Sequence, residues 1–180
     1  MKHSFIRFAS LALIIAALPL STATAGKLSG VINGKSYHVD STYDWNEDNY
    51  GVGFEYEFGS DSRWIKTAMA SGFRDSNNVM SYMAGGGLHR RLVQTDFLSG
   101  LHIDAGINAF VMTRNDVSDG KPFPGVLPSV SIGNDVMGFN FTYLPRKAVE
   151  SMVNATVNDP TIKGIFFVQF KINVEQLLPR

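Results

Sequence analysis

The feature that most constrains this chain is the alternation of apolar and polar residues in several short segments. In residues 101–111 the apolar side chains occupy every second position, and His102, Asp104 and Asn108 lie between them. Residues 51–58 and 137–143 alternate in the same way. A period of two is typical of β-strands, because successive side chains point to opposite faces of a sheet. The sequence therefore predicts an all-β fold with one apolar and one polar face.

Eight strands are expected, and their lengths approach the ~9–11 residues that a tilted strand needs to cross a bilayer. Turn residues separate them, and Asn33-Gly34 predicts a bend or small hairpin within the first strand. The expected strands are residues 28–38, 51–58, 64–73, 79–91, 101–111, 126–132, 137–143 and 164–172.

The connections between these strands are unequal. Those after the second, fourth and sixth strands are short turns. Those after the first, fifth and seventh are long loops, at residues 39–50, 113–125 and 145–162. Short periplasmic turns and longer external loops are typical of outer-membrane barrels. We therefore predict an eight-stranded antiparallel up-and-down transmembrane β-barrel whose odd-numbered connections lie on the external side.

A soluble, lipocalin-like barrel is the alternative, since it also has eight strands but holds its apolar residues inside. Alternation alone does not say which face points inward. The loop asymmetry favours the membrane barrel, and so do the sizes of the residues on the two faces. One face carries large side chains such as Phe139, Phe141 and Phe166, and the other carries Gly, Asn and Thr, which suit a narrow lumen.

The N-terminus predicts export. Basic residues precede an apolar run at residues 8–20, and Ala23-Thr24-Ala25 is a small-residue cleavage site. This pattern is that of a cleaved secretory signal peptide, residues 1–25, which would leave residues 26–180 as one barrel domain. No later apolar run is long enough to span a bilayer as a helix.

Composition excludes several kinds of site. The chain has no cysteine, which excludes disulfides and thiolate metal ligands. Lysine plus arginine and aspartate plus glutamate balance at 16 each, so there is no basic surplus for nucleic acid. His38, His89 and His102 fall on different strands without ligand spacing. We therefore expect no metal, no cofactor and no nucleic-acid partner.

The candidate site combines His38 with the Asp75-Ser76 pair. His38 ends the first expected strand and Asp75-Ser76 follows the third, so both lie at the external rim with one strand between them. Serine needs a base to act as a nucleophile or to transfer a proton, and a carboxylate can orient that base. The alternative is ordinary turn chemistry, since Asp and Ser side chains both bond nearby backbone groups.

Six short motifs follow one another along the chain in a familiar order. They are Tyr37-His38, Trp45-Asn46-Glu47 with the glycines that follow, residues 71–76, residues 112–116, residues 127–133 and residues 142–145. Their order and spacing resemble those of the lipid A palmitoyltransferases of Gram-negative outer membranes. That family consists of eight-stranded barrels that move palmitate from a glycerophospholipid to lipid A.

The resemblance implies roles for particular residues. It implies that His38, Asp75 and Ser76 are the catalytic residues, facing the outer leaflet of the outer membrane. It further implies substrate-binding positions: a floor for the acyl chain at Gly87, gaps in strand pairing at Pro128 and Pro145 that admit lipid, and a phosphate contact at Arg114. Simpler interpretations stand beside these, such as a strand bend for the glycines and a solvated loop charge for Arg114. A monomer is expected, with phospholipid as donor and lipid A as acceptor.

Two other functions compete with acyl transfer. A lipid hydrolase would pass the acyl group to water with the same residues. A non-catalytic barrel, serving as an adhesin or a structural protein, would use its long loops instead. The chain also departs from the resembling family, whose barrels begin with an amphipathic helix and carry Trp where Tyr37 stands.

Overall fold

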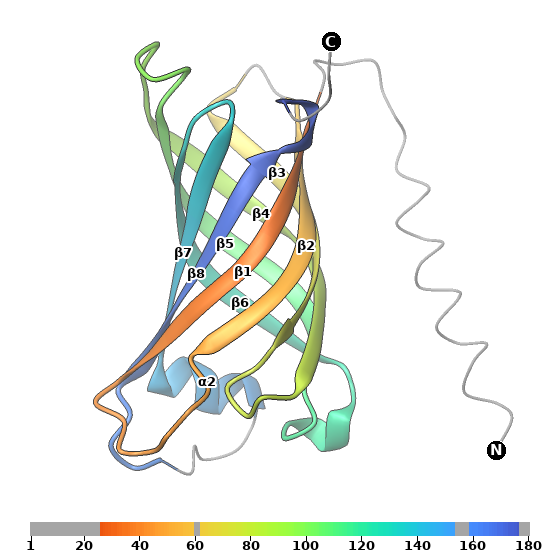
Figure 1. Ribbon diagram of the computed structural model, residues 1–180, viewed down its shortest axis with the longest axis vertical. Helices are drawn as coiled ribbons and strands as arrows, with labels where there is room; N and C mark the ends of the chain where they lie inside the picture. Colours follow the sequence, from red (N-terminus) through yellow and green to blue (C-terminus); the bar gives the residue numbers. More distant parts are fainter. Residues whose placement is uncertain (1–25, 60–61, 154–158, 177–180) are drawn as a thin grey trace, which may run out of the picture.

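The computed structural model describes residues 26–59, 62–153 and 159–176, which form a closed antiparallel barrel (Figure 1). Each strand pairs with its neighbours in sequence, and β8 pairs back to β1. The predicted eight-stranded up-and-down barrel is confirmed. The predicted signal peptide, residues 1–25, lies outside the described residues. The strands are β1 (Lys27–Val39), β2 (Asp48–Phe58), β3 (Trp64–Arg74), β4 (Met80–Gln94), β5 (His102–Thr113), β6 (Phe123–Gly133), β7 (Met137–Pro145) and β8 (Gly164–Asn173).

Most of the buried residues of this barrel are polar, and its exposed outer face carries many large apolar side chains. Along β5, His102 and Asp104 are buried whereas Ile107 and Val111 are exposed. Along β2, Glu55 is buried while Val52 and Phe54 are exposed. A soluble barrel would reverse this arrangement, so the pattern is that of a barrel whose outer face meets lipid.

The two ends of the barrel differ, as Figure 1 shows. The turn end carries the β2–β3, β4–β5 and β6–β7 connections. The loop end carries residues 40–47, 75–79 and 114–122, and the β7–β8 connection with the helix α2 (Arg146–Val153). Short 3-10 turns lie at Ser118–Gly120 in the third of these connections and at Val174–Gln176 after β8. No helix in the described part of the chain is long and apolar enough to cross a bilayer.

Two details of the sequence prediction were wrong. The β7–β8 connection was expected to be a loop, but α2 begins directly after Pro145. Eight residues are too few to show a helical period, and tertiary contacts stabilise so short a helix: Arg146 binds Glu150 one turn on and the carbonyl of Pro160. Some bounds also shift, with β2 beginning at Asp48 and β6 at Phe123, because ladder pairing in a closed barrel overrides strand propensity.

The lumen has two chemically different halves. In the half nearer the loop end, Phe73 of β3 and Phe167 of β8 meet inside the barrel with ring centroids 5.7 Å apart. In the half nearer the turn end, ion pairs fill the interior: Lys171 with Glu55 at 2.7 Å and Arg91 with Asp104 at 2.9 Å. Phe110 and Phe123 are buried in the half nearer the loop end, and so are the small polar side chains of Ser36 and Ser81. Aromatic rings and small polar groups therefore line the lumen beneath the rim that holds the candidate residues.

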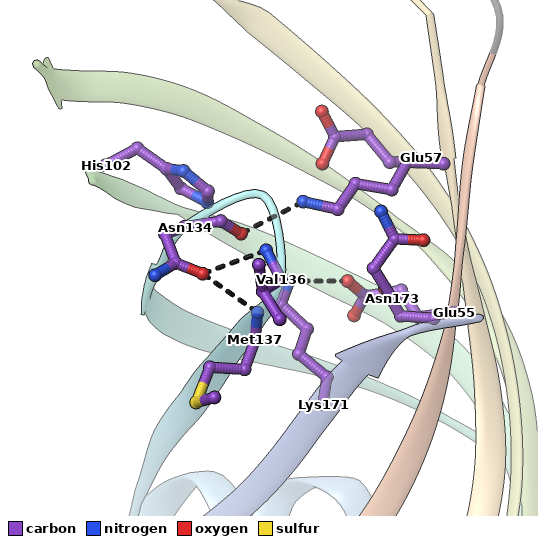
Figure 2. A pocket seen from close by; sticks show the side chains of 10 residues that line it. Glu55, Glu57, His102, Asn134, Val136, Met137, Lys171 and Asn173 are labelled. Carbon is purple, nitrogen blue, oxygen red and sulfur yellow. Dashed lines mark hydrogen bonds and ion pairs between the residues drawn. The ribbon is translucent and has the colours of Figure 1, made fainter. Parts of the chain in front are cut away.

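The mouth at the turn end is nearly closed by polar side chains (Figure 2). Lys27 donates to the Asn134 carbonyl at 3.0 Å, and the Asn134 side chain accepts from the backbone of the β6–β7 turn. The remaining cavity measures about 10 Å³, which is space for about one water. This end offers no room for a lipid chain.

Candidate active site at the loop end

A register irregularity in β1 aims His38 inward. Ser29, Val31 and Asn33 face the lumen, which is every second position of β1. Beyond Asn33 the inward-facing residues are Ser36 and His38. The pairing of β1 with both β2 and β8 shifts at this point, around Gly34. A β-bulge of this kind re-aims the side chains beyond it. Without it, uninterrupted alternation would place Tyr37 inward and His38 in the lipid.

His38 and Ser76 are in direct contact. The Nε2 atom of His38 lies 3.0 Å from the Ser76 hydroxyl oxygen. His38 is only 5% exposed and Ser76 is half-buried. The histidine comes from the end of β1 and the serine from the β3–β4 connection, so the barrel, and not local sequence, brings them together. A serine hydroxyl held against an imidazole nitrogen is the arrangement from which proton transfer to the imidazole can occur.

Glu47 lies on the other side of the imidazole. Its Oε1 atom is 3.3 Å from His38 Nδ1 and also accepts the backbone N–H of His38 at 3.0 Å. Sequence reasoning cited Glu47 only within a motif and assigned it no role. The first loop contains several acids, and spacing along the chain does not reveal which of them faces the histidine.

The first loop is also tied to the turn that holds Ser76. The backbone N–H of Asn46 donates to the Ser76 carbonyl at 3.0 Å, and the Asn46 side chain donates to the Asp75 carbonyl at 2.9 Å. Asn49, at the start of β2, donates to the Arg74 carbonyl at 2.8 Å. These bonds fix the position of the serine backbone relative to the loop that carries Glu47.

Asp75 does not contact His38 in the described structure, although it is only 1% exposed. Its carboxylate accepts the backbone N–H groups of Asn77 and Val79 at 2.9 and 3.1 Å, and the Ser81 hydroxyl at 2.9 Å. These are the contacts of an aspartate that organises a turn. The sequence allows two interpretations of Asp75-Ser76, turn chemistry and a catalytic pair. The contacts of Asp75 are those of turn chemistry, whereas Ser76 faces the histidine.

Arg114 is held by acidic side chains of the same rim. Its guanidinium makes two hydrogen bonds of 3.0 Å to Asp116 and lies 3.8 Å from the Asp75 carboxylate. Asn77 also donates to Asp116, at 2.8 Å. Burial raises the pKa of Asp116, but the bonds from Arg114 and Asn77 outweigh it and hold that pKa below its ordinary value. Arg114 therefore joins the β5–β6 connection to the turn that holds Ser76. A phosphate group would have to compete with Asp116 for the Arg114 guanidinium.

Gly87 faces the lumen at the boundary between its two halves. A Cβ atom there would lie within 3.0 Å of side-chain atoms of Thr67, His89 and Asn108. His89 and Asn108 both bond to Ser129, at 2.8 and 2.9 Å. The glycine thus lies directly against a connected layer of polar side chains.

Pro128 and Pro145 flank an interruption between β6 and β7. The ladder between these strands runs from Gly133–Gly138 to Ser129–Thr142 and stops there. Pro128 is the next residue of β6, and β7 continues unpaired on that side to Pro145. Proline has no N–H to offer a ladder. At the loop end, therefore, β6 and β7 are not joined by a ladder.

The site contains no group of side chains suited to a metal. Across residues 26–59, 62–153 and 159–176, no three His, Asp or Glu side chains are grouped closely enough to hold a metal ion. The chemistry available at this rim is that of a serine, a histidine and a carboxylate.

Fold and site together define a class: a lipid-facing β-barrel with a histidine–serine pair at its loop-end rim. The comparisons with known proteins agree with this class and narrow it. A model of the family described as "Antimicrobial peptide resistance and lipid A acylation protein PagP" matches residues 29–157. The chain belongs to this PagP family.

Three relatives show how distant the similarity is. Proteins named "Lipid A acyltransferase PagP" from Shigella boydii, Bordetella pertussis and Methylobacillus flagellatus are 32%, 30% and 29% identical to this chain. The matches cover 61%, 63% and 61% of the chain, and 58%, 60% and 58% of those relatives. The chain thus spans somewhat less than two thirds of the length of the curated relatives that it matches.

Proposed function

We propose that this protein is an outer-membrane acyltransferase that moves a palmitoyl or similar chain from a glycerophospholipid to lipid A. The observation that carries the proposal is the 3.0 Å contact between His38 Nε2 and the Ser76 hydroxyl, above the Phe73–Phe167 contact in the lumen of a barrel of the PagP family. Catalysis is assigned to His38 and Ser76, with Asp75 holding the turn on which Ser76 stands.

The reaction exchanges one ester for another. A carbon–oxygen bond in the donor breaks, and a new one forms to a hydroxyl of lipid A. The hydroxyl proton ends on the oxygen of the lysophospholipid that leaves. In one route Ser76 attacks the donor carbonyl, and His38 passes the serine proton to the leaving lysophospholipid oxygen. The lipid A hydroxyl then cleaves the acyl-serine ester, and His38 passes its proton back to Ser76. In the other route the acceptor hydroxyl attacks the donor directly, and its proton reaches His38 through Ser76 and then the leaving oxygen. Both routes need His38 with Nε2 unprotonated and facing Ser76.

The position of the pair fits substrates that lie in a membrane. The site is at the loop end, which we assign to the external side, so that it faces the outer leaflet where lipid A lies. The interruption between β6 and β7, at Pro128 and Pro145, gives a lipid a route from the membrane into the loop-end half of the lumen. Gly87 then marks the depth at which an acyl chain meets polar side chains.

Mass spectrometry of lipid A tests the proposal. The wild type, Ser76→Ala and His38→Ala are expressed in Gram-negative cells that lack their own lipid A acyltransferase. Wild-type lipid A should gain one acyl mass, and either variant should abolish the gain. Ser151→Ala, which removes an exposed hydroxyl on α2 at the same end, should behave as the wild type. An unchanged lipid A profile with well-inserted wild-type protein overturns the proposal, and free fatty acid in place of heavier lipid A identifies a hydrolase.

A further inference from the structure

We infer that Glu47 is the carboxylate partner of His38 and that Asp75 acts only on the turn that carries Ser76. The line of contacts Ser76–His38–Glu47 then has the order hydroxyl, imidazole, carboxylate. This inference rests on the proposed acyl transfer for its chemistry and on the geometry of three side chains for its assignment.

The first argument is the tautomer of His38. A carboxylate can only accept hydrogen bonds. An acceptor 3.3 Å from Nδ1 favours the proton on Nδ1, which leaves Nε2 with a free lone pair toward the Ser76 hydroxyl. That is the form of the imidazole that can accept a proton from serine. With the proton on Nε2, the histidine would donate to Ser76 and could not act as its base.

The second argument is how rigidly Glu47 is placed. The same Oε1 atom that faces the ring also accepts the backbone N–H of His38 at 3.0 Å. The backbone of Glu47 is anchored as well, since its carbonyl accepts the N–H of Ser36 at 2.9 Å. One carboxylate oxygen therefore bridges the main chain and the side chain of a single residue, and this fixes the carboxylate relative to the imidazole.

The third argument is that the carboxylate oxygens of Asp75 already have other partners. Its two oxygens accept from two backbone N–H groups and one hydroxyl, and Arg114 lies 3.8 Å away. All of these partners belong to the β3–β4 connection, the start of β4 or the β5–β6 connection. Among the described contacts none reaches the imidazole. Asp75 is thus a positioning residue for Ser76, and the two acids of the rim have separate tasks.

The pH dependence of acyl transfer distinguishes the role of Glu47 beside His38 from the role of Asp75 in the turn. Glu47 stabilises the protonated imidazole that forms when His38 accepts a proton. In Glu47→Gln that cation loses its partner, so we expect transfer to fall about a hundredfold and the acidic limb of the kcat/KM profile to move to lower pH. Arg114 and Asp159 also act on His38 at longer range, but they are unchanged in this variant. Asp75→Asn should lower kcat and leave the acidic limb where it is.

Two controls accompany these variants. Asp44→Asn removes one exposed carboxylate from the same loop and should leave both rate and profile unchanged. If Asp75→Asn moves the acidic limb and Glu47→Gln does not, the assignment is reversed and the inference fails. It fails equally if Glu47→Gln transfers at the wild-type rate.

The tautomer of His38 can be measured by NMR without any assay of acyl transfer. Protein labelled with ¹⁵N in its histidines, reconstituted in micelles, should show His38 protonated on Nδ1 near neutral pH, with the resonance assigned by its loss in His38→Gln. Glu47→Gln should shift the resonance toward the other tautomer, and Asp75→Asn should not. If the wild type itself is protonated on Nε2, the inference is overturned even when acyl transfer occurs. If the tautomer is as expected but no transfer is seen, it is the proposed function that fails.

Discussion

The indole of Trp45 stacks on the imidazole of His38, with ring centroids 5.4 Å apart and an angle of 19° between the planes. The indole is itself fixed, because its N–H donates to the Ser41 hydroxyl at 2.8 Å. Ser41 in turn donates to the carboxylate of Asp159, which comes from the β7–β8 connection. A residue of the last loop thereby holds the first loop against the histidine.

Asp159→Asn should slow acyl transfer without unfolding the barrel. The variant weakens the bond that holds Ser41, so Trp45 loses its anchor and the imidazole can turn away from Ser76. Misplacement of a reacting group by about 1 Å costs roughly a hundredfold, so we expect a loss of about ten- to hundredfold in kcat with little change in KM. Asp40→Asn is the matched control, because it breaks only an exposed ion pair with Lys163 between the same two loops. Equal effects of the two variants would contradict the positioning role.

The hydrogen bond between Ser41 and Asp159 should persist at acidic pH. Burial raises the pKa of Asp159, but the hydrogen bonds from Ser41 and Thr161 outweigh it and hold that pKa well below its ordinary value. A carboxyl with a lowered folded pKa stabilises the folded loops above its unfolded pKa and loses that effect as the pH falls through the folded value. In a Trp64→Phe/His38→Gln background, in which no imidazole titrates beside the indole, Trp45 emission should therefore stay constant from neutral pH down to about pH 4. Emission that changes between about pH 7 and about pH 5 would contradict this.

The barrel was predictable from sequence because its two faces differ so strongly in chemistry. A period of two is visible wherever one face meets lipid and the other a narrow lumen, as along β5 and β7. Closure and strand order then follow from the short connections, and they bring the ends of β1 and β3 to one rim.

What sequence did not reveal depends on contacts between distant segments. Glu47 is one of several acids in its loop, and only the fold shows which one faces His38. The sequence predicts an irregularity at Asn33-Gly34, but only the strand pairing shows that it shifts the register and so turns His38 inward. Arg114 bonds to Asp116 in its own loop, but its second acidic neighbour, Asp75, lies in another loop. The helix α2 depends on contacts with the residues around Pro160. None of these leaves a periodic signal.

Gly87→Met should shorten the acyl chain that the protein accepts. The side chain has little room toward the turn end, where His89 lies, or to the sides, where Thr67 and Asn108 pair with position 87. Atoms of all three would lie within 3.0 Å of a Cβ atom, and His89 and Asn108 are bonded to Ser129. The added side chain must therefore extend toward the loop end, where it takes the place of the end of the acyl chain. Transfer from phosphatidylcholines of defined chain length measures the change, with Ala84→Met on the opposite face of β4 as the control. An unaltered preference in folded Gly87→Met would rule out this role for the glycine.

The ion pair inside the barrel should matter for stability. Glu55 accepts from Lys171 at 2.7 Å and from Asn140 at 3.1 Å, and the side chains of Lys171 and Glu55 are only 14% and 10% exposed. Lys171→Met leaves Glu55 charged and without its cation, which should cost about 3–5 kcal/mol in the free energy of unfolding. Urea unfolding in micelles measures this loss.

Removal of both charges gives the decisive comparison. Glu55→Gln/Lys171→Met leaves neither charge of this pair in the lumen, and the new side-chain amide at position 55 can still accept the hydrogen bond from Asn140. Because a buried pair contributes little net stability once its desolvation is counted, the double variant should recover most of what Lys171→Met loses. A double variant as unstable as Lys171→Met would show that the lysine acts by packing rather than by charge.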